Sequence, residues 1–227
     1  MADAILAFED ITLHSSEGEP VFEGLSASLA RGQHWRLDPS LPGSGTTAFL
    51  RLAAGLAHAH AGRVLLDGMP HHRTEFAHPA LVRGLLGWVP TGGNLIVNLS
   101  LAANLALPLR FVRGLRPLAA QEAARTWLAR AGLADLAGRR PHALEPLDRW
   151  LGALARCAAT GASLWLVDRP PTLLDDATAA TAADLLAHGL ADPAASTLVV
   201  DPPDGWAGPS LDCYHLLEGR LRPGSAP

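Results

Sequence analysis

The feature that most constrains the fold is a strand, a glycine-containing loop and a helix that follow one another directly in the first quarter of the chain. Residues 34–37 (HWRL) form a short candidate strand. Residues 40–45 contain a proline and two glycines, which is the composition of a loop. Residues 47–58 then carry apolar side chains at helical spacing. This succession predicts an α/β unit built on a parallel sheet.

The rest of the chain extends this unit on both sides of a helical insert. Further strands are expected at residues 5–13, 22–29, 63–66, 85–89, 164–167, 197–200 and 213–217, the last before a tail rich in glycine and proline. Between them, residues 100–159 are rich in alanine, leucine and arginine and are expected to be helical, with amphipathic helices at 121–131 and 147–158. One more helix is expected at 177–188. No internal repeat or linker interrupts this order.

Composition excludes several classes of protein. The 227 residues are 48% hydrophobic and 18% charged, so the chain is globular rather than disordered. A net charge of -4 argues against a nucleic-acid partner, which usually meets a basic face. Cys157 and Cys213 are too few for a disulfide framework. No apolar run is long enough to span a bilayer, and the first residues lack the basic region of a signal peptide, so we expect a cytoplasmic location.

One compositional bias has a direct chemical consequence. All 18 basic residues are arginine, and the chain contains no lysine. Any mechanism that needs a lysine amine is therefore excluded.

Several segments resemble, in chain order, the motifs of ABC-transporter ATP-binding subunits. Residues 40–56 (SLPGSGTTAFLRLAAGL) resemble the phosphate-binding loop and the helix after it. Segment 164–170 (LWLVDRP) resembles the second Walker motif. The other matching segments are 87–91 (GWVPT), 99–109 (LSLAANLALPL), 140–144 (RPHAL), 150–158 (WLGALARCA), 172–175 (TLLD) and 197–200 (TLVV). The resemblance covers nearly the whole chain.

The resemblance implies a specific architecture and specific partners. The fold would be a P-loop ATPase domain of the ABC type, with a mainly parallel core sheet, antiparallel strands near the N-terminus and a helical subdomain. The single domain would span 1–227, with a core from 1–90 and 160–227 and helices at about 91–159. Such subunits bind Mg-ATP, pair head to tail with a second cassette (here an intact ATPase or a second copy) and attach to membrane-spanning subunits at the cytoplasmic face.

The resemblance also assigns positions to the nucleotide. Thr47 and Asp168 stand where the family binds magnesium, and Thr46 replaces the lysine that contacts the phosphates. Pro42 removes a backbone donor from the same loop. The full set of nucleotide positions is Ser40, Gly43, Ser44, Gly45, Thr46, Thr47, Asp168 and, for adenine stacking, His14.

The residues of hydrolysis are all replaced. Arg169 occupies the position of the glutamate that polarises water, and a guanidinium keeps its charge and cannot act as a base. Thr91 replaces the glutamine that senses magnesium, and Pro202 replaces the switch histidine. We therefore expect no catalytic residue. Losing one such electrostatic group typically costs about 3–4 kcal/mol of transition-state stabilisation.

The signature segment, which faces the nucleotide of the partner cassette in the family, is changed too. Its Ser-Gly-Gly-Gln is replaced by Glu145, Pro146, Leu147 and Asp148. The two carboxylates would repel a triphosphate, and Pro146 restricts the backbone. Asp175, in contrast, keeps its place in the dimer-contact loop, although it also suits a helix cap.

Several interpretations stay open at this stage. Gly43 to Gly45 also suits a plain turn, His14 an exposed histidine, and Asp168 with Arg169 a closed ion pair. The main functional hypothesis is a non-hydrolysing cassette with a structural or regulatory role. One alternative is an active ATPase that energises transport, with lipid as a candidate cargo, in which a partner or an arginine (Arg36, Arg51 or Arg169 for the lost cation) supplies the missing groups. The other is a soluble regulator that binds a nucleotide or another anion.

Overall fold

The computed structural model describes residues 4–40, 43–71, 84–189, 191–202, 205–207, 211–217 and 219–224. One of its two sheets is antiparallel, has the strand order β2-β1-β4-β5 and comes from the N-terminal part. Its strands are β1 (Ala4–His14), β2 (Pro20–Ala30), β4 (Ala61–Leu66) and β5 (Met69–Pro70).

The second sheet is the centre of the fold and has the order β10-β9-β3-β8-β7-β6. Neighbouring strands are parallel except for the hairpin of β9 and β10. The order of the strands across the sheet differs from their order along the chain. Parallel strands cannot be joined by tight turns, and helical crossovers connect them, as in other α/β folds. The strands are β3 (His34–Leu37), β6 (Leu86–Val89), β7 (Leu164–Val167), β8 (Ser196–Val200), β9 (Asp212–Leu217) and β10 (Arg220–Pro223).

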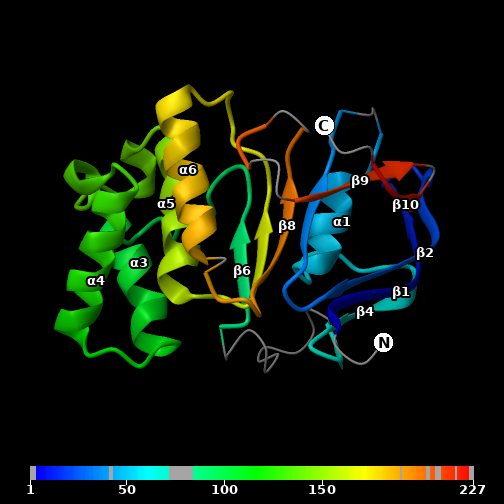
Figure 1. The fold of residues 1–227 in the computed structure, drawn as a ribbon, viewed down its shortest axis with the longest axis horizontal. Helices are drawn as coiled ribbons and strands as arrows, with labels where there is room; N and C mark the ends of the chain where they lie inside the picture. The colour runs from blue at the N-terminus through cyan, green and yellow to red at the C-terminus, as the bar shows by residue number, and fades with distance from the viewer. Residues whose placement is uncertain are drawn as a thin grey trace.

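Helices cover both faces of the central sheet. Figure 1 shows α1 between the two sheets and α3 to α6 together on the other side. The helices are α1 (Thr46–Ala53), α3 (Leu101–Phe111), α4 (Pro117–Arg130), α5 (Pro146–Thr160) and α6 (Asp176–Gly189), with short 3-10 turns η1 (Ala134–Leu136) and η2 (Pro141–Ala143). Helix α3 begins at Ser100, whose hydroxyl accepts a hydrogen bond from the Ala103 amide. None of the described helices is long and apolar enough to cross a membrane.

The two faces of β7 belong to two separate hydrophobic cores. Leu164 and Leu166 pack with α1 and the N-terminal sheet, whereas Trp165 and Val167 pack with the helices of the other side. This follows from the alternation of side chains along a strand that is buried on both faces. Trp165 is completely buried, as predicted from the apolar strand around it.

Two local expectations were wrong, and one short strand was not predicted. Helix α1 ends at Ala53 rather than at residue 58, because Gly55 adopts a φ of 67° that ends the helix. The chain does not end its sheet with the strand at 212–217, because Gly219 turns it back into β10. The two residues of β5 form a short edge strand that alternation could not reveal.

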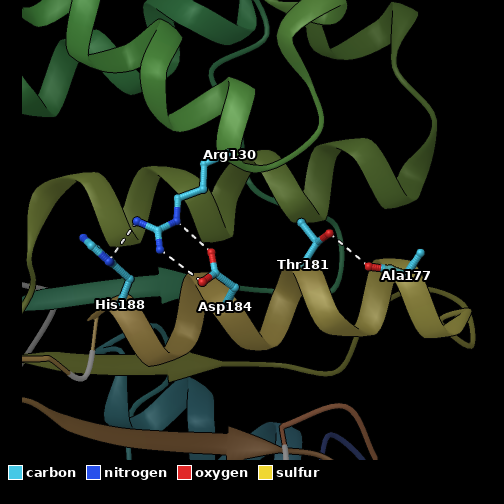
Figure 2. A network of polar contacts seen from close by, with 5 residues as sticks. All are labelled: Arg130, Ala177, Thr181, Asp184 and His188. Carbon is cyan, nitrogen blue, oxygen red and sulfur yellow. Dashed lines mark hydrogen bonds and ion pairs between the residues drawn. The ribbon is translucent and has the colours of Figure 1, made fainter.

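An ion-pair network joins α4 to α6. The guanidinium of Arg130 donates two hydrogen bonds to the Asp184 carboxylate, at 2.7 and 3.0 Å, and a third to Nδ1 of His188 at 2.9 Å. Figure 2 shows these contacts on neighbouring turns of α6. Trp127 completes the cluster, because its ring meets His188 edge-on and lies 5.6 Å from the Arg130 guanidinium carbon.

Replacing Asp184 with asparagine should lower stability only above acidic pH. The Arg130 hydrogen bonds hold the pKa of Asp184 below its ordinary value. The stabilisation is therefore present above the unfolded-state pKa of about 3.9 and is lost as pH falls through the lower folded-state value. Urea unfolding midpoints should differ at pH 7 and converge in acid. Glu122→Gln, an exposed control on α4, should leave the midpoint unchanged, and a pH-independent difference would contradict the assignment.

Candidate functional site

Several of the predicted site residues follow strands that end at one edge of the central sheet. Strands β3, β8, β7 and β6 are adjacent and parallel, so the residues that follow them share the carboxyl edge. This edge is where α/β sheets bind ligands. It brings together the loop after β3, Pro202 after β8, Asp168 and Arg169 after β7, and Thr91 after β6.

The loop after β3 ends in an open helix N-terminus. Gly43 and Gly45 have φ values of 68° and 73°, and Gly45 is the N-cap of α1 without any side-chain cap. The positive φ favours glycine at position 45, and a Cβ there would also lie close to the Phe22 ring, at 3.1 Å. Backbone N–H groups in this arrangement suit an anion. The predicted loss of a donor at Pro42 lies outside the described residues.

The hydroxyl positions of this loop differ in exposure. Thr47 is exposed on the first turn of α1, where the resemblance places a magnesium ligand. Thr46, in the position of the phosphate-binding lysine, is only 6% exposed. Ser44 is half-buried. The Ser40 amide donates a hydrogen bond to Oδ1 of Asp38, the residue after β3, at 2.8 Å, so this donor already has a partner.

Asp168 is held by its neighbours. Its Oδ1 accepts a hydrogen bond from the Arg169 amide at 2.9 Å, and its carboxylate also accepts a hydrogen bond from the Thr91 hydroxyl. Its backbone oxygen accepts from Nε1 of Trp150 at 3.0 Å. Burial raises the pKa of Asp168 above its ordinary value, and these hydrogen bonds and the Arg169 charge only partly oppose that shift.

Asp168→Asn should therefore raise the free energy of unfolding at pH 7. A carboxyl with a raised folded-state pKa contributes stability below about pH 3.9, the unfolded-state pKa, and loses it as pH rises through the folded-state value. The advantage of the variant should shrink as the pH falls from 8 to 4, followed by urea midpoints. The exposed Asp135→Asn should show no such trend, and a loss of stability at pH 7 in Asp168→Asn would contradict the argument.

Two further buried carboxylates lie at the same edge, and the sequence analysis missed both. Asp38 follows β3 and Asp201 follows β8, with exposures of 6% and 2%. Asp38 lies 3.4 Å from Nδ1 of His215, and Oδ2 of Asp201 accepts from the Ala207 amide at 3.0 Å. With Asp168, three adjacent strands therefore end in an aspartate. The signal was an acidic residue directly after an apolar strand.

Of the three arginines proposed to replace the lost cation, one lies at this edge and is exposed. Arg36 is within β3 and only 1% exposed, and Arg51 is in the last turn of α1, at the end opposite the loop. Arg169 is exposed directly after β7. The position expected to hold a general base therefore presents a positive charge beside Asp168.

The signature residues start α5. Glu145 is the N-cap without a side-chain hydrogen bond, and Pro146 is the first helical residue. Leu147 is partly buried and packs against the larger hydrophobic core. Asp148 lies in the first turn, where its negative charge interacts favourably with the positive end of the helix dipole.

Asp175 caps the next helix, as one interpretation predicted. Its Oδ1 accepts from the Thr178 amide at 2.8 Å, and hydrogen bonds from Thr178 lower its pKa. Leu173, two residues earlier, is 99% exposed. The cap therefore leaves the loop before α6 exposed.

His14, the residue assigned to adenine stacking, already has an aromatic neighbour. Its ring lies 5.0 Å from that of His60 in an edge-on arrangement, and Nδ1 of His60 accepts a hydrogen bond from the His14 amide. Within the ranges that the structure describes, no cluster of histidine, cysteine and acidic side chains could hold a metal ion.

Comparison with known proteins gives a consistent result. No family model matches the chain. The chain is 33% identical over 97% of its length to the Fe(3+) ions import ATP-binding protein FbpC of Pseudomonas fluorescens, of which it spans 62%. It is 32% identical over 96% of its length to the lipoprotein-releasing system ATP-binding protein LolD of Chromohalobacter salexigens, covering 93% of that protein.

The fold has solved counterparts. The dimeric ATP-binding cassette MJ0796, in a post-hydrolysis state bound to ADP and Pi, matches 98% of this chain and 99% of its own with a TM-score of 0.80 at 23% identity. The antiparallel sheet, the mainly parallel central sheet and the helices are those of an ABC ATPase. With these relatives and this fold, the chain belongs to the family of ABC-transporter ATP-binding subunits.

Proposed function

We propose that this chain is a cassette subunit that no longer hydrolyses ATP by itself and serves a structural or regulatory role in a membrane transporter. The observation that carries the proposal is Arg169, exposed at the carboxyl end of β7 in place of the base. A permanent cation there repels the proton that must leave the attacking water.

Loss of the phosphate-binding lysine supports the same conclusion. Thr46 is a buried hydroxyl, and the carboxylates of Asp38, Asp168 and Asp201 add negative charge at the same edge. Each missing electrostatic group costs about 3–4 kcal/mol, and although such effects are not additive, the remaining loop does not compensate for several losses. Thr47 and Asp168 would supply the oxygen ligands of magnesium if a nucleotide binds.

A second cassette is the first proposed partner. Glu145 and Asp148 lie at the start of α5, the position that faces the partner's nucleotide in the family, and Leu173 extends into solvent from the loop before α6. We infer an asymmetric pair in which an intact subunit supplies the working site.

The division of the chain into a core (1–90 and 160–227) and a helical subdomain (91–159) is also part of this proposal.

A membrane-spanning subunit is the second proposed partner. A groove of about 410 Å³ lies between the β6 strand and α3, with Trp88, Ile96 and Phe111 among its apolar walls. Ile96 and Phe111 are 46% and 74% exposed. A groove of this kind suits an amphipathic helix of a partner, and it would hold the chain at the cytoplasmic face of the membrane.

A cassette that energises transport is the second candidate, and the names of the relatives favour it. They are ATP-binding proteins of iron import and of a lipoprotein-releasing system. In that case a partner or an arginine would supply the missing groups. The lipoprotein-releasing relatives also keep lipid among the possible cargoes.

Titration with Mg-ATP and measurement of phosphate release separate the two candidates. The purified chain, alone and with its co-purifying partner, would be compared with Asp168→Asn and with the exposed control Asp135→Asn. We expect no saturable binding at millimolar ATP and no turnover by the chain alone. Turnover that Asp168→Asn abolishes and Asp135→Asn retains would overturn the proposal in favour of the active ATPase. Tight binding without turnover would make the chain an ATP-dependent clamp.

A further inference from the structure

The turn that joins α3 to α4 exposes an unusual mixture of side chains. Phe111 and Leu118 are 74% and 67% exposed, and Leu115 between them is 36% exposed. Arg110, Arg113 and Arg116 are exposed in the same segment. We call residues 110–118 the α3–α4 tip. Three large apolar side chains and three arginines are therefore exposed within nine residues. The segment is amphipathic, although its apolar and charged residues do not follow helical spacing.

The charge of the tip is not neutralised locally. No acidic residue occurs in the sequence between Glu75 and Glu122, although the whole chain carries a net charge of -4. Within the described ranges, no ion pair involves any arginine of the tip. The tip is therefore a compact positive region on an otherwise acidic protein, and it favours an anionic partner.

The apolar side chains decide what kind of anionic partner fits. Phe111 and Leu118 gain free energy only where they leave water, whereas arginine side chains can bury their stems and keep the guanidinium at a polar boundary. This combination matches the headgroup region of a bilayer, where a few apolar groups and a few cations together give reversible attachment. A soluble anion would use the arginines but not Phe111 or Leu118.

The position of the tip agrees with this partner. Figure 1 shows the α3–α4 connection at the lower end of these helices, whereas β6 and β8 run upward toward the site edge. Phe111 also forms part of the groove beside β6, so the tip continues directly from that groove. From these observations we propose that the α3–α4 tip binds the surface of a membrane containing anionic phospholipid. The attachment needs neither ATP nor an occupied groove.

Vesicle co-sedimentation of the full chain tests the proposal. The vesicles would be phosphatidylcholine alone or phosphatidylcholine mixed with phosphatidylglycerol, at low and at physiological salt. We expect binding to the anionic vesicles only, weakened by salt. Inorganic phosphate at equal ionic strength should compete no better than chloride, because a lipid surface rather than free phosphate is the ligand.

Two variants divide the charge from the apolar contribution. Arg110→Gln/Arg116→Gln should weaken vesicle binding about 25-fold, since each cation near an anionic surface contributes about fivefold. Arg113 stays unchanged because its guanidinium lies against Gly161. Leu118→Ser should weaken binding roughly tenfold and do so at both salt concentrations.

Matched controls come from the same chain. Arg139 and Arg140 are exposed near the other end of α3, where the Leu101 amide donates a hydrogen bond to the Arg139 carbonyl. Leu173 is exposed on the loop before α6. Arg139→Gln/Arg140→Gln and Leu173→Ser should bind as the unchanged chain does. Equal losses in controls and tip variants, or equal binding to neutral vesicles, would overturn the proposal.

A protein partner is the remaining outcome. If the chain ignores anionic vesicles but its co-purified membrane subunit protects the tip arginines from chemical modification, the tip is a protein contact and the lipid proposal is wrong. Phosphate release is measured separately, so this failure is distinguishable from failure of the proposed function.

Discussion

Trp150→Ala is expected to lower the free energy of unfolding by about 3–5 kcal/mol, the range for removing a large aromatic side chain from a core. The Trp150 side chain is completely buried and packs edge-on against Trp206 at 5.2 Å between ring centroids. Its Nε1 also donates to the backbone oxygen of Asp168, so the same residue fixes the end of β7. The substitution removes packing from the larger core and leaves a buried carbonyl without its donor.

Urea denaturation followed by circular dichroism measures this loss. Trp150→Phe retains a ring but not the hydrogen bond, and it should cost about 1–2 kcal/mol. Trp127→Ala, on the partly exposed surface of α4, should cost less than Trp150→Ala. If the two alanine variants unfold at the same urea concentration, Trp150 does not have the structural role assigned to it.

Thr46→Lys is expected to increase affinity for Mg-ATP by about 10- to 100-fold, because a hydrogen bond to a charged group contributes about 1.5–3 kcal/mol. The loop already has the glycine conformations and the uncapped helix start that an anion needs. What it lacks is a cation that can reach the terminal phosphates. A lysine at this position would supply that cation.

The control is His58→Lys, which places a lysine at an exposed position beyond the last turn of α1. It should produce little of the gain, since it lies at the end of the helix opposite the loop. Calorimetric titration of both variants measures the difference. Equal affinities for both lysine variants would mean that general charge attraction, not the loop geometry, governs binding.

Combining Thr46→Lys with Arg169→Glu should then restore measurable phosphate release.

Much of the fold could be predicted because it depends on local patterns. The apolar segment at 164–167 was long enough and uniform enough to identify a strand buried on both faces, and the structure confirms it as β7. The glycines at 43 and 45 identified the loop before α1, and both adopt the positive φ that only glycine takes without strain. The cap formed by Asp175 was likewise predictable from its place before a helix.

The rest depends on contacts between distant segments. Asp38 and Asp201 are far apart in sequence, and only the adjacency of β3 and β8 makes them neighbours of one edge. The bond between Thr91 and Asp168 arises in the same way, from the pairing of β6 with β7. Strand β10 needed knowledge of the turn at Gly219 and of the space beside β9.

The thiol of Cys157 lies where α5 contacts β6 of the central sheet. It is so close to Gly87 that no residue larger than glycine fits at position 87. Burial raises the pKa of this thiol to about 12, so the native chain keeps it protonated and inert. Cys213 is partly exposed on β9. An alkylating reagent should therefore modify Cys213 in the native protein, and Cys157 only when α5 separates from β6. The rate at which Cys157 is modified therefore reports on that separation without any engineered label.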